Sequence, residues 1–327
     1  MSGNHQQSRD SALNLVRAAA NAGARFIKFQ VYTPDTITFR SSSPLFRVHS
    51  DSQWSGYTSL HDLYSIAFTP WDWIRDLFSL SISLNLVPFA SPFDSTAVTF
   101  LESLDCSVYK IASPEITDHG LIEACCKTGK PIILSTGLAS IEDLDSAVDL
   151  IRSHGNQFAI LKCVSAYPTP NEHLNLSTIP WLKDRYGCSV GLSDHTLGFA
   201  APLAATALGA SLIEKHFKLP DDTTSVDAAF SLSISELPHL TELISQTFAS
   251  IGQPTLDIPP SAQSSISGRR SLFAVADISE GDLFTSSNIR SIRPNNGLHP
   301  KHLQYLLGRP SPRSYKAGEP LTPDLLN

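Results

Sequence analysis

Long apolar runs are missing from this sequence. No stretch approaches the roughly 20 apolar residues of a membrane-spanning helix, and the opening Met-Ser-Gly-Asn-His-Gln-Gln holds no apolar core of a signal peptide. Charged residues make up only 17% of the chain and hydrophobic residues 42%, a balance typical of folded rather than disordered proteins. We therefore expect a globular, cytoplasmic protein with no membrane partner.

Cysteine and positive charge are also scarce. The five cysteines are an odd number, and the adjacent Cys125 and Cys126 suit neither a zinc knuckle nor a disulfide scaffold, so we interpret all five as reduced thiols. Lys and Arg number 24 against 31 Asp and Glu, a net charge of −7 that argues against a nucleic-acid partner. An anionic substrate would need a local cationic pocket, because the overall field repels it.

Short apolar strands alternate with helical patterns through most of the chain. We expect strands at 25–30, 86–90, 108–111, 131–134, 158–163, 189–192 and 211–213, each followed by a helix. This pattern predicts an α/β fold, a TIM (β/α)8-type barrel over residues 1–251. Seven strands are one too few, and the chain opens on a helical pattern at 10–22, so the first strand is the one expected to be lacking. The two flanking strands would then face each other across an open seam. An open doubly wound sheet is the alternative.

Two segments depart from this alternation. Residues 31–68 form a long irregular connection whose Trp54, Tyr57 and Tyr64 favour an ordered lid. Residues 252–268 are rich in Pro, Ser and Gly and predict a linker. The remaining 269–327 form a small domain of short strands and turns, in which residues 279–285 and 316–322 echo each other, each with a Gly entering an extended segment. So small a domain is expected to lean on another surface.

The stretch from Gly191 to Phe217 predicts a strand, a helix and a second, parallel strand. His195 follows the first strand and His216 the second, at the sheet edge where active sites of α/β proteins lie. Two histidines at neighbouring strand ends could share one metal ion. The alternative is a pair of hydrogen-bonded core histidines.

Lys28 and Lys110 lie within predicted barrel strands, where an unpaired lysine is costly to bury. They would supply the cationic pocket that an anionic substrate needs in a protein of net negative charge. Hydroxyl groups for an anion stand at other strand ends, on Ser113, Ser135 and Ser193. The alternative for each serine is a helix N-cap.

The motifs YKIAS, ILSTG, SAYPTP, SDHTLG and IEKHF resemble the sialic acid synthase family, and the resemblance covers essentially the whole chain. The domain at 269–327 resembles the antifreeze-like (SAF) domain that ends these enzymes. The resemblance implies that phosphoenolpyruvate condenses with an N-acetylated amino sugar to form a nonulosonic acid and phosphate. It also implies a homodimer in which the SAF domain is swapped between subunits.

The resemblance implies roles for individual residues. His195 and His216 would bind a divalent cation, Mn²⁺ or Mg²⁺, and Glu115 would handle the attacking water, its alternative being a first-turn helix carboxylate. Arg293 would enter the partner's barrel, its alternative being a solvated turn residue. The remaining substrate ligands would be Lys28, Lys110, Ser113, Ser135, Ser165, Tyr167, Ser193 and Asp227.

Residues 225–232 and 291–303 look like the pseudaminic acid synthase branch, which implies 2,4-diacetamido-2,4,6-trideoxy-altrose as the sugar. N-acetylmannosamine, the sugar of sialic acid synthases proper, is the alternative. Family members also place a strand ending in Ala-Glu before the position of Met1, and that glutamate contributes to the sugar site. Because that glutamate is absent here, a catalytically impaired, ligand-binding scaffold is an alternative function. A free-standing ice-binding module would leave the first 250 residues unexplained.

Overall fold

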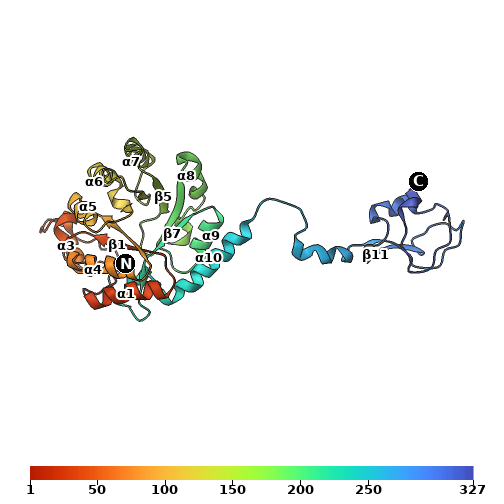
Figure 1. Cartoon of the computed structure of the whole chain (residues 1–327), viewed down its shortest axis with the longest axis horizontal. Coiled ribbons are helices and arrows are strands. Elements are labelled where there is room, and N and C mark those ends of the chain that lie inside the picture. The colour runs from red at the N-terminus through yellow and green to blue at the C-terminus, as the bar shows by residue number, and fades with distance from the viewer. Residues whose placement is uncertain (327) are drawn as a thin grey trace. The chain divides into compact units, whose positions relative to one another are not determined.

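The computed structural model describes residues 1–326, which divide into two compact units, Met1–Gly252 and Gln253–Asn327. The first unit is built on a seven-stranded parallel sheet whose strands follow one another in chain order (Figure 1). The strands are β1 Phe26–Val31, β2 Val87–Pro92, β3 Tyr109–Ile111, β4 Ile132–Ser135, β5 Phe158–Cys163, β6 Ser189–Asp194 and β7 Leu212–Lys215. The predicted α/β fold is confirmed as a curled barrel that is short of one strand.

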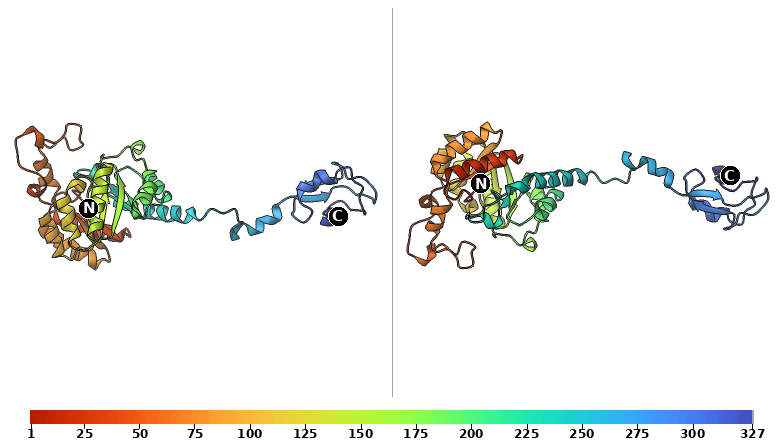
Figure 2. Two further views of the ribbon diagram at one scale, coloured as in Figure 1. Left: turned by 90° about the horizontal axis from the view of Figure 1, so that it is seen from above. Right: turned by 90° about the horizontal axis from the view of Figure 1, so that it is seen from below.

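Helices surround the strands and cover the outer surface of the sheet (Figures 1 and 2). One precedes β1, α1 Arg9–Asn21, and it packs against the helix that leads into β2, α4 Trp71–Ser83. The others each follow a strand: α5 Ser95–Glu102, α6 His119–Cys126, α7 Ile141–Ser153, α8 Thr178–Tyr186, α9 Ala200–Ala207 and α10 Leu237–Ile251. Their starts follow local chemistry, as in α7, where Ser140 and Asp143 form a reciprocal capping box.

The predicted seam lies between β1 and β7, which share no ladder among the residues described. A cavity of about 700 Å³ opens there, lined on its apolar side by Ile27, Ile213 and Leu240. The first residues of the chain bridge part of the gap. The Met1 amine donates to the carbonyl of Lys28 on β1 at 2.7 Å, and Asn4 Nδ2 donates to the carbonyl of Phe217 at 2.8 Å.

The connection at 31–68 is more regular than its sequence indicates. It contains the short helix α2 Pro34–Ile37 and the helix α3 Leu60–Ala67. Ser59 is a sequence signal for the start of α3, because serine is a preferred N-cap residue. Its side chain accepts a hydrogen bond from the backbone of Asp62. Within the same segment, Trp54 Nε1 donates to the carbonyl of Val226 at 2.9 Å, so this part is tied to the chain that follows β7.

The second unit has an apolar cluster of its own, which includes Leu272, Phe284 and Tyr315. An antiparallel pair, β10 Ser271–Ala274 and β11 Ile289–Ile292, forms its only regular sheet among the described residues. The two echoed segments are both turns, and their glycines, Gly281 and Gly318, have φ values of +89° and +93°. Glycine reaches this left-handed region without steric cost, which explains the echo.

The predicted linker is not irregular throughout, since residues Pro260–Gly268 form a 3-10 helix, η6, that begins with proline. Among residues 1–326, no helix is long and apolar enough to cross a membrane.

Close packing of β6 on its neighbours leads to a stability prediction. A Cβ at Gly191 would lie 2.3 Å from the carbonyl oxygen of Leu212 and 2.7 Å from Leu161 Cδ2. Gly191→Ala should therefore force the strands apart and lower the free energy of unfolding by about 1–3 kcal/mol, measured by urea denaturation. Gly56→Ala is the control, because nothing lies within 4 Å of that position. Equal stability of both variants would show that the packing at β6 is looser than described.

Candidate active site

The carboxyl ends of β6 and β7 bring two polar clusters together. Ser193 pairs in register with Glu214 across these parallel strands. Side chains alternate between the two faces of a strand, so His195 follows Ser193 and His216 follows Glu214 on the same face. The two imidazole rings lie with their centroids 5.3 Å apart in a T-shaped arrangement. The predicted neighbourhood of the two histidines is therefore present in the structure.

A half-buried carboxylate, that of Glu214, joins the two lysines. Lys28 Nζ donates to Glu214 Oε1 at 2.6 Å and Lys110 Nζ donates to the same oxygen at 3.1 Å. Ser193 Oγ donates to it as well, at 3.2 Å. We call Lys28, Lys110 and Glu214 the lysine cluster. It carries one net positive charge at the barrel mouth, which suits an anion.

Electrostatics within the lysine cluster keep the Glu214 carboxylate ionised. Burial opposes ionisation of Glu214, but the two ammonium groups outweigh burial and hold the pKa of its carboxyl well below the usual range. Burial lowers the pKa of Lys28 to about 8, with Lys110 adding to the effect and Glu214 opposing it. Lys28 is therefore still mostly protonated at neutral pH. Both lysines were predicted from the sequence but Glu214 was not, although its place in IEKHF, two residues before His216, was a signal for it.

Unpartnered hydroxyl groups stand near the lysine cluster. Ser135 is 2% exposed, and its Oγ, like that of Ser165, is buried with no hydrogen-bond partner among the described residues. Ser113 Oγ accepts from the backbone N–H of Gly137 at 2.8 Å. A Cβ at Gly137 would lie 2.3 Å from Ser165 Oγ and 2.7 Å from Ser113 Oγ, so glycine leaves a small polar recess there. Buried donors without partners are typical of a ligand site.

The donor set around the histidines fits a metal ion. His195 is 5% exposed and its Nδ1 lies 3.0 Å from the carbonyl oxygen of Val164, which can only accept. Nδ1 therefore carries the proton, and Nε2 keeps the lone pair that a metal requires. Burial lowers the pKa of His216 to about 4, which outweighs the opposing effect of Asp227 and leaves this ring neutral. No group of three or more His, Cys, Asp and Glu side chains in residues 1–326 is arranged to hold a metal. The two histidines are the residues that would hold one.

Aromatic side chains form one wall of the site. The ring of Tyr167 packs on His195 with centroids 4.4 Å apart, on Phe230 at 5.0 Å and on Trp54 at 5.4 Å. Trp54 comes from the connection at 31–68, so this segment reaches the site as a lid would. The wall excludes water from one side of the histidine pair.

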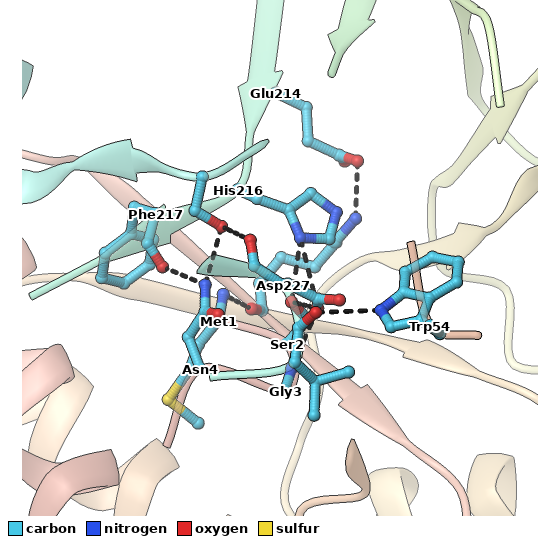
Figure 3. A network of polar contacts seen from close by, with 12 residues as sticks. Met1, Ser2, Gly3, Asn4, Trp54, Glu214, His216, Phe217 and Asp227 are labelled. Carbon is cyan, nitrogen blue, oxygen red and sulfur yellow. Dashed lines mark hydrogen bonds and ion pairs between the residues drawn. The ribbon is translucent and has the colours of Figure 1, made fainter. Parts of the chain in front are cut away.

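The N-terminal segment also enters the site, which the sequence analysis did not anticipate (Figure 3). Ser2 Oγ lies 2.8 Å from His216 Nδ1 and also donates to Asp227 Oδ2. The backbone N–H of Gly3 donates to the same carboxylate oxygen at 3.1 Å. Burial opposes ionisation of Asp227, but these hydrogen bonds and His216 outweigh it and hold the pKa of the carboxyl below its usual value.

Comparison with known proteins agrees with this geometry. The NeuB family matches residues 15–255, and the SAF domain matches residues 269–327. The chain belongs to the NeuB family. The pseudaminic acid synthase of Helicobacter pylori is 41% identical over 326 residues, which are 99% of this chain and 95% of that protein. That of Campylobacter jejuni strain 81-176 is 39% identical, over 98% of this chain and 93% of that protein.

Solved structures lead to the same family. The N-acetylneuraminic acid synthetase of Leptospira borgpetersenii, crystallised with citrate, is 30% identical, with a TM-score of 0.70 over 80% of this chain and 87% of that one. The spore coat polysaccharide biosynthesis protein SpsE of Bacillus subtilis is 30% identical, with a TM-score of 0.64 over 99% of this chain and 92% of that one. The predicted membership of the sialic acid synthase family, with a C-terminal SAF domain, is confirmed. The chain is a synthase of that family.

Two ionisable groups near the mouth of this NeuB site have altered proton affinities. Burial raises the pKa of Glu115 to about 7, and its Oε2 has no partner among the described residues. Cys163 is buried, and burial alone would raise the pKa of its thiol. The neighbouring His195 and Ser113 and the charge of Lys110 outweigh that effect and lower the pKa to about 7. Glu115 can therefore gain or lose a proton near neutral pH, as an acid–base group must. The sequence analysis treated Cys163 only as a reduced thiol.

Arg293 belongs to the SAF unit, where it is exposed and forms no ion pair with any described residue. The loop that follows it is fixed by the buried Ser271, whose Oγ donates to the carbonyl of Pro294 at 2.7 Å and accepts from the N–H of Gly297 at 2.9 Å. Its role at a partner's site remains a prediction.

The raised pKa of Glu115 predicts how stability depends on pH. Its folded value near 7 lies above the ordinary value of 4.5, so its contribution to stability is full below about pH 4.5 and is lost as pH rises through 7. Relative to Glu115→Gln, the wild type should lose roughly 3 kcal/mol of unfolding free energy between pH 4.5 and 8. Urea denaturation at both pH values measures the difference, with Glu172→Gln at an exposed position as control. Parallel pH profiles for wild type and Glu115→Gln would contradict the burial of this carboxyl.

Proposed function

We propose that this chain is a pseudaminic acid synthase. It condenses phosphoenolpyruvate with 2,4-diacetamido-2,4,6-trideoxy-altrose to form a nonulosonic acid and phosphate. The lysine cluster carries the proposal, because the buried Lys110 and the half-buried Lys28 share a single carboxylate and leave positive charge free for an anion. The pseudaminic acid synthases of Helicobacter pylori and Campylobacter jejuni, similar over nearly the full chain, support the choice of sugar.

The reaction joins carbon 3 of phosphoenolpyruvate to the aldehyde carbon of the open-chain sugar. Water then adds at carbon 2, and phosphate leaves. Lys28 and Lys110 bind the phosphate and stabilise its negative charge as it departs. The unpartnered hydroxyls of Ser135 and Ser165 donate to the remaining oxygens of the anion. Ser113 and Ser193 hold neighbouring groups in place through Gly137 and Glu214.

Glu115 takes up the proton of the attacking water, a role that its pKa of about 7 suits at neutral pH. Tyr167 covers one side of the site and excludes bulk water, and Asp227 faces the sugar with the oxygen that it does not share with Ser2. The Nε2 atoms of His195 and His216 would hold Mn²⁺ or Mg²⁺, which supplies a Lewis acid for the aldehyde oxygen.

A product assay tests the proposed function. The purified protein is incubated with Mn²⁺, phosphoenolpyruvate and either the diacetamido trideoxyhexose or N-acetylmannosamine, and phosphate release and product mass are measured. We expect release with the diacetamido sugar and a product whose mass equals the two substrates plus water minus phosphate. Product from N-acetylmannosamine alone would make the chain a sialic acid synthase. Binding of phosphoenolpyruvate without any product would make it an impaired scaffold.

We further propose that the protein is a homodimer in which each SAF unit serves its partner's barrel. Charge supports this, because residues 253–327 hold eight Lys and Arg against six Asp and Glu, a net charge of +2. The first 252 residues therefore hold 16 Lys and Arg against 25 Asp and Glu, a net charge of −9. Opposite charges favour docking of one kind of unit on the other. Arg293, exposed and without an ion pair among the described residues, would complete the anion site of the partner.

Subunit complementation tests the dimer. Neither Arg293→Ala nor His216→Ala should be active alone, because each homodimer lacks one residue at both sites. A heterodimer of the two contains one site with both residues intact, so mixing should restore about half of the wild-type activity per heterodimer. Phosphate release measures the activity, and native mass spectrometry confirms the heterodimer. Confirmed heterodimers without activity would show that Arg293 acts in its own chain or has no part in the reaction.

A further inference from the structure

The N-terminal segment touches the histidine pair through one side chain, that of Ser2. We propose that Ser2 is a positioning residue that fixes the tautomer of His216, so that Nε2 carries the lone pair at the site. The consequence for metal binding rests on the proposed function, whereas the tautomer itself does not. Nothing in the sequence motifs pointed to Ser2, because the residue contacts His216 across 214 positions of the chain.

The hydrogen bonds have only one consistent direction. The Ser2 hydroxyl has one proton, and it donates that proton to Asp227 Oδ2, since an ionised carboxylate can only accept. At 2.8 Å from His216 Nδ1, the same oxygen must then accept. The chain runs from His216 Nδ1–H through Ser2 to Asp227 (Figure 3). Nδ1 is therefore the protonated nitrogen and Nε2 the free one.

Ser2 is necessary for this chain because Asp227 is too far away to replace it. Its Oδ2 lies 3.7 Å from His216 Nδ1, beyond hydrogen-bond distance. Without the hydroxyl, His216 Nδ1 would lose its acceptor, and the ring proton could move to Nε2. A proton on Nε2 blocks the lone pair that a metal needs.

The segment is built to hold Ser2 in place. Ser2 is 4% exposed and Asn4 is 1% exposed. Gly3 donates its N–H to Asp227, and Asn4 Nδ2 donates to Ser231 Oγ at 2.8 Å. The next residue, His5, is 0% exposed and lies 3.1 Å from Thr69 Oγ1 through its Nε2. The Ser2 hydroxyl is thus ordered before any ligand arrives.

The same arrangement occurs at His195 with a different acceptor. There a backbone carbonyl, that of Val164, receives the Nδ1 proton at 3.0 Å. The two histidines therefore present the same nitrogen, Nε2, and each has its Nδ1 proton bonded elsewhere. A cation shared by the two histidines requires this tautomer of both. A backbone carbonyl fixes the tautomer of His195, and Ser2 fixes that of His216.

The test reads the tautomer directly in metal-free protein. Histidine is labelled with ¹⁵N, His216 is assigned by the signal that His216→Gln removes, and ¹H–¹⁵N correlation spectra are recorded at pH 8. We expect protonated Nδ1 in wild type, a mixture of tautomers in Ser2→Ala and recovery of the wild-type pattern in Ser2→Thr. Ser81→Ala is the matched control, because Ser81 is also a buried serine but donates its hydrogen bond to the backbone of Leu77 within α4.

Binding of Mn²⁺, followed by electron paramagnetic resonance, gives the second measurement. Ser2→Ala should bind Mn²⁺ about 10- to 100-fold more weakly than wild type, and Ser2→Thr and Ser81→Ala should stay within about threefold. A wild-type His216 protonated on Nε2 would overturn the proposal, whether or not any variant folds. Unchanged tautomers in folded Ser2→Ala would overturn it as well. The expected tautomers with no Mn²⁺ binding by wild type would support the role of Ser2 and contradict the metal of the proposed function.

Discussion

One half-buried carboxylate, that of Glu214, connects the two ends of the sheet. Lys28 lies on β1 and Glu214 on β7, edge strands that share no ladder among the described residues, yet their side chains meet at 2.6 Å. Lys110 joins from β3 at 3.1 Å. Three strands thus converge on one charge in a poorly solvated place. Removing one partner of such a group is strongly destabilising, because it leaves another charge buried without compensation.

The remainder of the site follows from this convergence. The net positive charge of the lysine cluster and the unpartnered Ser135 and Ser165 define where an anion can lie. The alternation of side chains along β6 and β7 then places His195 and His216 beside it, with their lone pairs on Nε2. Glu115, whose pKa is about 7, is the group there that exchanges a proton at neutral pH. The residues proposed to bind the substrates and the metal and to transfer the proton therefore come from β1, β3, β4, β6 and β7 and from the loops that follow these strands and β5.

Much of this could be predicted from the sequence. Strand–helix alternation indicated the barrel and its missing strand, and motifs at strand ends indicated the lysines, serines and histidines. The features that were not predicted depend on contacts between residues that are far apart in the sequence. Glu214 was visible in IEKHF, but its bonds to Lys28 and Lys110 span 186 and 104 positions. Ser2 sits in a short polar leader without periodicity, and α3 was missed because apolar residues are few around its N-cap. The place of Arg293 stays a prediction, because each unit folds around its own core.

The most direct test of this account is the stability of Glu214→Gln. The variant keeps the shape of the side chain but leaves the buried Lys110 and the half-buried Lys28 without their carboxylate. The account predicts a loss of about 3–5 kcal/mol in unfolding free energy at pH 7, measured by urea denaturation. Asp76→Asn, which breaks the exposed ion pair with Arg9, should lose little, because solvent screens exposed pairs. A loss for Glu214→Gln no larger than that of Asp76→Asn would contradict the claim that this carboxylate holds the sheet and the anion site together.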